Sequence, residues 1–291
     1  MAHRPEIYAV GDQYDRLLPP YLFPGSNGPQ TDEDILQAYL LQTFGAPDQQ
    51  LSIFEDAAGT GRMTNHLLPY ASSIVCADKH QGVLGQLRGK YPWVRTVQAN
   101  TRDISGDAVG RDFDLIGSFW AISYAIGECL ETIEDDGTIT PVTDLEEGVR
   151  EAHRCIGNVV GLLASEGRFV SYLFDSECPE QQAVTRIWEQ LGPDPGGHRS
   201  FTRELLTDAL DVHASTQGKR LAVIHHIGQV SFTDKGHLLD FYANVHAKGN
   251  TQLIDTPIFR EETSALIAAH TNPDGTIGIP TGMYEFRVEP N

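Results

Sequence analysis

The 291-residue sequence is short of basic residues and contains no long apolar run, and each shortage excludes a class of protein. Lysine and arginine number 21 against 40 aspartates and glutamates, which gives a formal net charge of −19. A surface this negative repels phosphate backbones, so no nucleic-acid partner is expected. No stretch approaches the roughly 20 apolar residues that span a bilayer, and no apolar leader follows Met1. We therefore expect a cytoplasmic protein without a membrane partner.

Cysteine is also scarce, because the chain has only four, at positions 76, 129, 155 and 178. They lie far apart and form no CxxC pair, which argues against a zinc site or a disulfide framework. We expect reduced thiols and no metal. The hydrophobic fraction of 40% is sufficient for a sizeable core, and the length fits one large domain with a cap.

Short apolar runs alternate with stretches of helical periodicity through the first two thirds of the chain. The runs predict strands at 51–54, 73–77, 94–99, 113–119 and 167–174, and the intervening stretches predict helices at 63–70, 81–90 and 145–163. Strands that alternate with helices form right-handed crossover units around a mostly parallel sheet. The expected fold class is therefore α/β, with a doubly wound sheet.

The two ends of the chain depart from this alternation. Residues 1–30 are rich in Tyr, Pro and Gly and are expected to form an irregular arm or short cap, followed by a helix at 32–44. We assign 1–48 to this arm and cap helix, and 49–291 to the main domain. In the last third we expect helices at 202–212, 235–245 and 259–270. A strand at 221–232 and hairpin-like strand material at 276–288 should complete the same sheet as antiparallel additions.

A glycine-containing turn follows the first predicted strand of the main domain, in the segment Glu55-Asp56-Ala57-Ala58-Gly59-Thr60-Gly61. Glycine permits positive φ and lets a ligand approach the main chain closely. At the first strand of an open α/β sheet such a turn forms a nucleotide crevice, although glycines also occur in ordinary turns between strand and helix. Asp78 ends the second strand, about where a doubly wound fold places a carboxylate for ribose hydroxyls.

Glu55 argues against a dinucleotide as the ligand. A pyrophosphate would lie at the N-terminus of the following helix, where a nearby carboxylate repels it. Thr64 stands where a dinucleotide fingerprint needs a small residue. An adenosine ligand that carries an amino group suits Glu55 better.

These residues resemble the first motif of the class I S-adenosylmethionine-dependent methyltransferases, with Ala57 in place of the usual glycine. The segment 113–124 is similar to the fourth strand and following turn of small-molecule N-methyltransferases, and Tyr14-Asp15 resembles the N-terminal tyrosine signature of amine and amino-sugar methyltransferases. The resemblance implies a Rossmann-like, seven-stranded-type methyltransferase fold with S-adenosyl-L-methionine as cofactor. It implies these cofactor-binding residues: Tyr14, Glu55, Ala57, Gly59, Gly61, Asp78, Asn100, Thr101 and Phe119.

Candidates for the acceptor side are fewer. Trp120 and Tyr124 follow the fourth strand and could form an aromatic wall for a substrate, with core packing as the alternative. The acidic residues Glu131 and 134–136 could steer a cationic acceptor, or form a solvated loop. His225 and His226 are weak candidates for a general base, because neighbours in a strand face opposite sides and most histidines are packed or on the surface.

The sequence thus predicts methyl transfer to a small-molecule acceptor, with nitrogen slightly favoured over oxygen and a natural-product or antibiotic pathway as one setting. Transfer from a sulfonium needs alignment and exclusion of water, and needs no metal. A nicotinamide-dependent oxidoreductase, and a methyltransferase-fold protein that binds the cofactor without transferring methyl, are the alternatives. A homodimer is left open.

Overall fold

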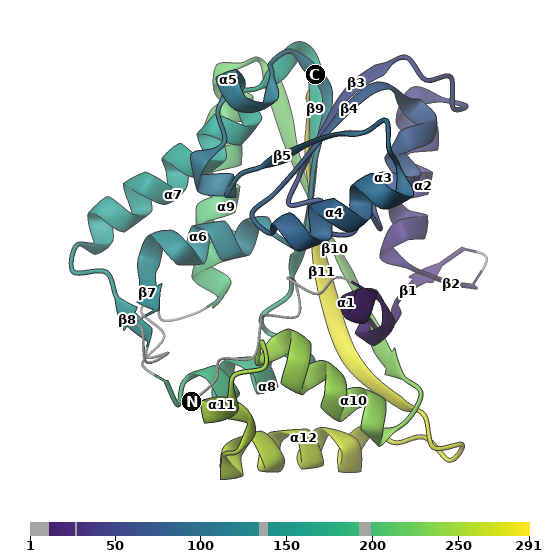
Figure 1. Cartoon of the computed structure of the whole chain (residues 1–291), viewed down its shortest axis with the longest axis vertical. Coiled ribbons are helices and arrows are strands. Elements are labelled where there is room, and N and C mark those ends of the chain that lie inside the picture. The colour runs from purple at the N-terminus through teal and green to yellow at the C-terminus, as the bar shows by residue number, and fades with distance from the viewer. Residues whose placement is uncertain (1–11, 27, 134–138, 192–198) are drawn as a thin grey trace.

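The structure is a computed structural model that describes residues 12–26, 28–133, 139–191 and 199–291. Within these residues one nine-stranded sheet runs through the molecule in the order β2-β1-β10-β11-β9-β6-β3-β4-β5 (Figure 1). Its parallel half is built from β3 (Leu51–Asp56), β4 (Ala71–Asp78), β5 (Arg95–Gln98), β6 (Phe113–Phe119) and β9 (Leu163–Phe174). The expected α/β class and mostly parallel sheet are confirmed.

The other half of the sheet is antiparallel. Its strands are β1 (Tyr21–Gly25), β2 (Gly28–Gln30), β10 (Lys219–Phe232) and β11 (Ile277–Pro290). Strand β11 pairs with β9 on one side and with β10 along its full length on the other, and β10 pairs with β1. The C-terminal strands therefore complete the same sheet, as expected. A separate pair joins β7 (Glu131–Ile133) to β8 (Ile139–Pro141).

Helices cover both faces of the sheet. One core contains apolar residues of α6 (Ile122–Leu130), α7 (Leu145–Val160) and α9 (Arg199–Thr216). The other contains those of α2 (Asp32–Phe44), α8 (Pro179–Trp188), α10 (Lys235–Phe241) and α12 (Pro257–His270). Burial of these apolar faces is the main stabilising contribution to the arrangement. No helix in the described ranges is both long and apolar enough to cross a membrane.

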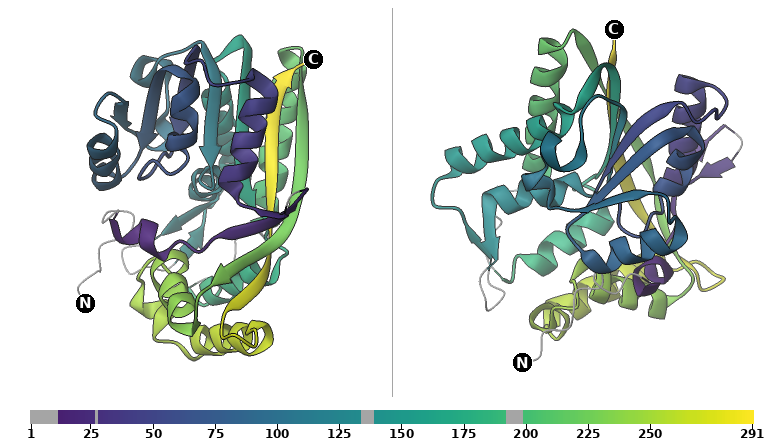
Figure 2. Two further views of the ribbon diagram at one scale, coloured as in Figure 1. Left: turned by 90° about the vertical axis from the view of Figure 1, so that its right-hand side faces the viewer. Right: turned by 45° about the horizontal axis from the view of Figure 1, so that its top comes forward.

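The remaining helical segments are short. They are α1 (Asp12–Leu17), α3 (Thr64–Leu67), α5 (Gly106–Val109), α11 (Thr251–Ile254), the 3₁₀ turns Leu68–Tyr70 and Thr101–Asp103, and the π-helical turn Tyr242–His246, beside the longer α4 (Gln81–Lys90). Helices α8, α10, α11 and α12 gather at one end of the molecule, with α1 beside them (Figures 1 and 2). The long strands β10 and β11 extend from the sheet into this helical end, so they connect the two parts.

Several sequence expectations are wrong in detail. Residues 21–25 and 28–30 are not irregular, because they form β1 and β2, and β1 extends the sheet through backbone hydrogen bonds to β10. The segment 276–288 is one long strand rather than hairpin-like material, because its antiparallel partner is β10. The expected helix 63–70 is divided, since Pro69 lacks the N–H that would continue an α-helix. Helices α6 and α8 were not expected at all.

Candidate active site

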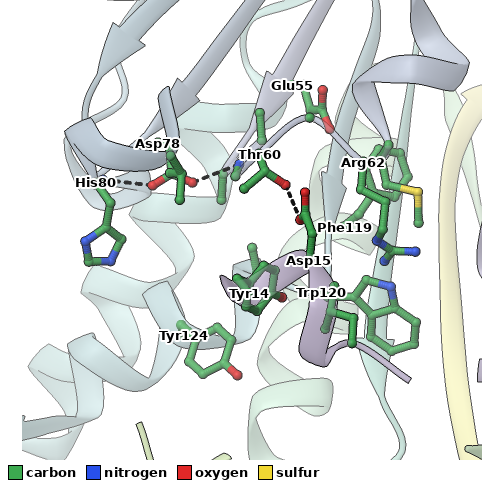
Figure 3. A pocket seen from close by; sticks show the side chains of 18 of the residues that line it. Tyr14, Asp15, Glu55, Thr60, Arg62, Asp78, His80, Phe119, Trp120 and Tyr124 are labelled. Atoms are coloured by element: carbon green, nitrogen blue, oxygen red, sulfur yellow. Dashed lines mark hydrogen bonds between the residues drawn. The ribbon is translucent and has the colours of Figure 1, made fainter. Parts of the chain in front are cut away.

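The carboxyl ends of the parallel strands, α1, and the turn after α10 surround one cavity of about 800 Å³. The cofactor residues that the resemblance implies all line it: Tyr14, Glu55, Ala57, Gly59, Gly61, Asp78, Asn100, Thr101 and Phe119. Trp120 and Tyr124 line it as well. Figure 3 shows how the labelled side chains converge on this space from several elements.

The glycine turn is held open by its backbone conformation and by hydrogen bonds to the neighbouring strand. Ala57, Gly59 and Gly61 all have positive φ, of 53°, 55° and 90°. The Ala58 N–H donates to the Ala77 carbonyl at 2.9 Å, which ties the turn to the end of β4. A Cβ on Gly59 would meet no heavy atom within 4 Å, so the main chain there borders open space in the cavity wall.

Asp78 is fixed at the cavity by two backbone amides. Its Oδ2 accepts from the Gly59 N–H at 3.0 Å, and its Oδ1 accepts from the His80 N–H at 2.8 Å (Figure 3). Each carboxylate oxygen can accept a further hydrogen bond, so a diol that reaches Asp78 would find acceptors already oriented.

Glu55 is buried at the end of β3, and burial raises the pKa of its carboxyl to about 8. Its Oε2 accepts from the Thr64 hydroxyl at 2.5 Å. The side chain of Thr64 therefore supports the acid. From the sequence, Thr64 is expected only to disfavour a dinucleotide ligand. Glu55 Oε1 has no hydrogen-bond partner among the described residues, although Glu55 lines the cavity. A cationic group there would stabilise the ionised carboxylate.

A second buried acid, Asp56, lies behind the turn. The hydroxyls of Thr101 and Ser118 donate to its two oxygens at 2.9 and 3.0 Å, and burial raises its pKa to about 6. The Thr101 hydroxyl is thus engaged with Asp56, so any ligand contact of Thr101 must also involve other atoms. Asp56 joins β3 to β6 and to the segment after β5.

Helix α1 is docked directly on the glycine turn. The Thr60 hydroxyl donates to Asp15 Oδ1 at 2.5 Å (Figure 3). Lys90 Nζ lies 3.0 Å from Asp15 Oδ2. These contacts place Tyr14 in the cavity, where burial raises the pKa of its hydroxyl well above the usual value. The N-terminal segment therefore covers the turn that precedes α3.

The end of β6 forms an aromatic part of the wall. Trp120 has a φ of 63°, and its indole Nε1 donates to Asp32 Oδ2 at 2.6 Å. Its ring centroid lies 4.4 Å from that of Phe174 and 5.3 Å from that of Tyr21. Trp120 thus packs against neighbouring rings and also lines the cavity. Core packing and an aromatic wall, the two roles expected from the sequence, are therefore compatible. Asp32 also pairs with Arg62, whose guanidinium reaches it through two nitrogens at 2.7 and 3.0 Å.

A cluster of polar side chains lies between the segment after β5 and helix α6. The Asn100 side-chain oxygen accepts from the Arg102 N–H at 3.1 Å, and its amide donates to Glu128 Oε2 at 2.9 Å. Lys79 forms an ion pair with Glu128 at 2.9 Å. Lys79 and Glu128 also line the cavity, so this cluster contributes three lining side chains.

The two weak base candidates do not line this cavity. His225 Nε2 lies 2.8 Å from Asp175 Oδ2, and its ring stacks on Tyr284 with centroids 4.3 Å apart. His226 Nε2 lies 2.9 Å from Glu285 Oε2. His225 thus stacks on Tyr284 of β11 and His226 pairs with the next residue, Glu285, which agrees with the expected alternation of faces and leaves both rings outside the cavity lining.

Sequence reasoning missed residues that the fold brings to the cavity wall: Asp32, Arg62, Glu128 and His246. Arg62 directly follows the glycine turn, so its position was a usable signal. The sequence around His246 carries no comparable signal, because its partner Glu180 lies in helix α8, which was not expected. Of the acidic stretch, Glu131 lies in β7 and residues 134–136 lie outside the described residues.

No family model and no curated protein matches this sequence. A putative methyltransferase from Bacillus halodurans C-125 is similar in structure, with a TM-score of 0.52 and 13% identity over 88% of this chain and 99% of that chain. The chain has a methyltransferase-type fold.

Two further solved structures are similar at lower TM-scores. The YcgJ protein from Bacillus subtilis has a TM-score of 0.49 and 13% identity, over 88% of this chain and 98% of that chain. The N-methyltransferase NodS from Bradyrhizobium japonicum WM9, solved with S-adenosyl-L-homocysteine, has a TM-score of 0.44 and 14% identity, over 88% and 85%. At these identities the likeness concerns the fold.

Proposed function

We propose that this methyltransferase-fold chain is an enzyme that transfers a methyl group from S-adenosyl-L-methionine to nitrogen or oxygen of a small molecule. The observation that carries the proposal is the buried Glu55 carboxyl beside the glycine turn, with one oxygen unpartnered among the described residues and its pKa raised to about 8. A cationic amino group would pair with it, whereas a pyrophosphate would gain nothing there.

The donors and acceptors along the wall fit the parts of that cofactor. Glu55 suits its ammonium and Asp78 the ribose diol, while Arg62 can approach its carboxylate. Gly59 leaves room for the ligand at the main chain. When bound, the cofactor supplies an electrophilic methyl on a sulfonium. The chain's own part is to align the acceptor, to exclude water with α1 and the aromatic wall, and to accept a proton where the acceptor must lose one.

Binding measurements test this proposal. Calorimetry with S-adenosylmethionine and with NADH should give heat only with the first, since the nicotinamide alternative requires a pyrophosphate site. Asp78→Ala should weaken S-adenosylmethionine binding by about 1.5–3 kcal/mol, the typical loss when hydrogen bonds to a charged group are removed.

Asp114→Ala is the matched control, because Asp114 also accepts from a backbone N–H, that of Ser52 at 2.8 Å, but does not line the cavity. Unchanged affinity in a folded Asp78→Ala protein would exclude Asp78 from the site. Binding without transfer to any acceptor would favour the alternative of a protein that has lost the reaction.

A further inference from the structure

A buried carboxylate, Glu180 on α8, lies behind the part of the cavity wall that β1 and the turn after α10 form. Its side chain is 0% exposed. Oε1 accepts from the Tyr21 hydroxyl at 2.9 Å and lies 3.0 Å from His246 Nε2, while Oε2 accepts from the Thr281 hydroxyl at 2.7 Å. Three segments that are remote in sequence therefore converge on one acid.

The protonation of this group follows from its partners. Burial alone would raise the pKa of Glu180, but the hydrogen bonds from His246 and Thr281 and the nearby imidazole outweigh it and lower the pKa. Glu180 is then an ionised acceptor, so His246 Nε2 carries a hydrogen and donates it. In a neutral imidazole the other nitrogen, Nδ1, holds the lone pair. No described group forms a hydrogen bond with Nδ1, and His246 lines the cavity.

The backbone and neighbouring rings fix the orientation of His246. It ends the π-helical turn Tyr242–His246, a rare conformation that is frequent at functional sites. The Trp188 indole donates to the His246 carbonyl at 2.9 Å, and the ring of Phe241 meets the imidazole edge-on at 4.6 Å. The imidazole is therefore held from two sides while one nitrogen is left for a ligand.

A purely structural role explains this arrangement poorly. An ion pair or a charged hydrogen bond in the interior loses the hydration energy of its charges. Apolar residues of similar size often stabilise such a contact equally well. A carboxylate that holds one imidazole nitrogen is, in contrast, the arrangement that orients a histidine and stabilises its protonated form. Flat rings of Tyr21, Trp120 and Phe174 border the same cavity, which suits an acceptor that carries a ring.

We propose that His246 is the general base of the transfer, that Glu180 is its positioning residue, and that the acceptor atom is a hydroxyl on a ring compound. This inference rests on the proposed function. The acceptor oxygen forms the new bond to the methyl carbon as the carbon–sulfur bond breaks and its electron pair stays on sulfur. The hydroxyl proton moves to His246 Nδ1, and the Glu180 carboxylate balances the imidazolium charge. A neutral amine would need no such base, so the pair favours oxygen over the nitrogen that the sequence slightly favours.

Titratable groups from several elements of the described part of the chain lie around His246. They are Glu180 on α8, Tyr21 on β1 and Tyr242 in its own turn, while Lys248 in the following segment lies over the rings of Tyr124 and Trp188. Of these groups, Glu180 is the acid that can balance the imidazolium charge once His246 has accepted a proton.

The test measures methyl transfer from S-adenosylmethionine to phenol and to the more acidic 4-nitrophenol, at about pH 5.5 to 9. His246→Gln should lower kcat/KM for phenol by ~10²–10⁴. With 4-nitrophenol, which ionises without help, the loss should be much smaller. Glu180→Gln should lower the phenol rate less than His246→Gln does, and His270→Gln, outside the cavity, should change neither rate.

Calorimetry with S-adenosylmethionine on each variant separates the two proposals. If the wild-type protein does not bind it, the proposed function fails and this inference fails with it. If the wild-type protein binds it but methylates benzylamine and neither phenol, or if His246→Gln loses the same factor on both phenols or on neither, the inference alone is overturned. Should His246→Gln fail to fold, the ratio of the Glu180→Gln rates on the two phenols decides: a larger loss on phenol than on 4-nitrophenol supports the inference, and equal losses overturn it.

Discussion

The two walls of the cavity are built from contacts of very different range. At the glycine turn, Thr64 supports Glu55 from nine positions away, and Gly59 binds Asp78 from 19 positions away. On the other wall, Glu180 meets His246 and Tyr21 across 66 and 159 positions. The first wall is a local motif, and the second exists only because antiparallel strands and C-terminal helices fold back on the sheet.

The two fully buried glutamates of these walls differ in charge state for a physical reason. Glu55 has a hydroxyl and a thiol as its side-chain hydrogen-bond partners, so burial dominates and raises its pKa to about 8. Glu180 has an imidazole beside it, and its pKa is lowered. Two carboxyls that are buried to a similar extent thus have opposite roles. Glu55 would be stabilised in its ionised form by an incoming cation, whereas Glu180 already has its partner in the protein.

The largest effect is expected from Gly59→Val, which should abolish measurable S-adenosylmethionine binding in calorimetry. The added side chain would enter the cavity and would also resist a φ of 55°. Gly218→Val is the control, because Gly218 has a φ of 64° and equally open surroundings outside the cavity. Normal binding by a folded Gly59→Val protein would mean that the turn is only structural.

Glu55→Gln should weaken cofactor binding by about 1.5–3 kcal/mol, since a charge-assisted contact to the ammonium is lost. For the wild-type protein, affinity should rise with pH up to about 8, because binding a cation requires the carboxyl to release its proton. Calorimetry in two buffers of different ionisation enthalpy detects that proton. An affinity that is flat with pH and no released proton would contradict the assignment.

The same variant should make the free protein more stable at alkaline pH. The folded state keeps the Glu55 proton up to about pH 8, whereas the unfolded chain loses it near 4.5, the ordinary pKa of a glutamate. Stability of the wild type therefore falls as pH rises between these values, and Glu55→Gln removes that loss. We expect a gain on the order of 2 kcal/mol above pH 8, measured by denaturant unfolding.

Trp120→Ala should raise the KM for a phenol acceptor about tenfold and change S-adenosylmethionine affinity by less than about 1 kcal/mol. The reason is that its ring borders the aromatic wall with Phe174 and Tyr21 rather than the glycine turn. Trp93→Ala, at a tryptophan that is 61% exposed, is the control for loss of an indole. If only the melting temperature of Trp120→Ala falls, the residue serves packing and the acceptor lies elsewhere.

The smallest effect is expected from Ala57→Gly, which should stabilise the protein by about 1 kcal/mol in denaturant unfolding. Ala57 has a φ of 53°, where a Cβ is strained and glycine is not. Ala58→Gly is the matched control in the same turn. Ala58 is not among the residues with positive φ, so this variant should lose stability. Equal changes in both variants would remove backbone strain as the explanation.

Prediction from sequence succeeded where a residue's neighbours in the chain determine its setting. Helix 81–90 and strand 113–119 have the expected bounds, because their apolar spacing and flanking turns are local signals. The helices α6 and α8 were missed, and with them the partners of Asn100 and His246, namely Glu128 and Glu180. His225 and His226 attracted attention as an adjacent pair, yet they pair with Asp175 and Glu285 outside the cavity.

The sequence by itself determined the α/β alternation, the glycine turn and the acid that ends the next strand, because each depends on backbone preferences and on spacings within one crossover unit. Only the tertiary structure decided that β1 and β11 flank β10, that α1 lies on Thr60, and that Glu180 meets His246. Such contacts depend on which distant apolar surfaces are buried together. That choice is made by the whole core and leaves no pattern along the chain.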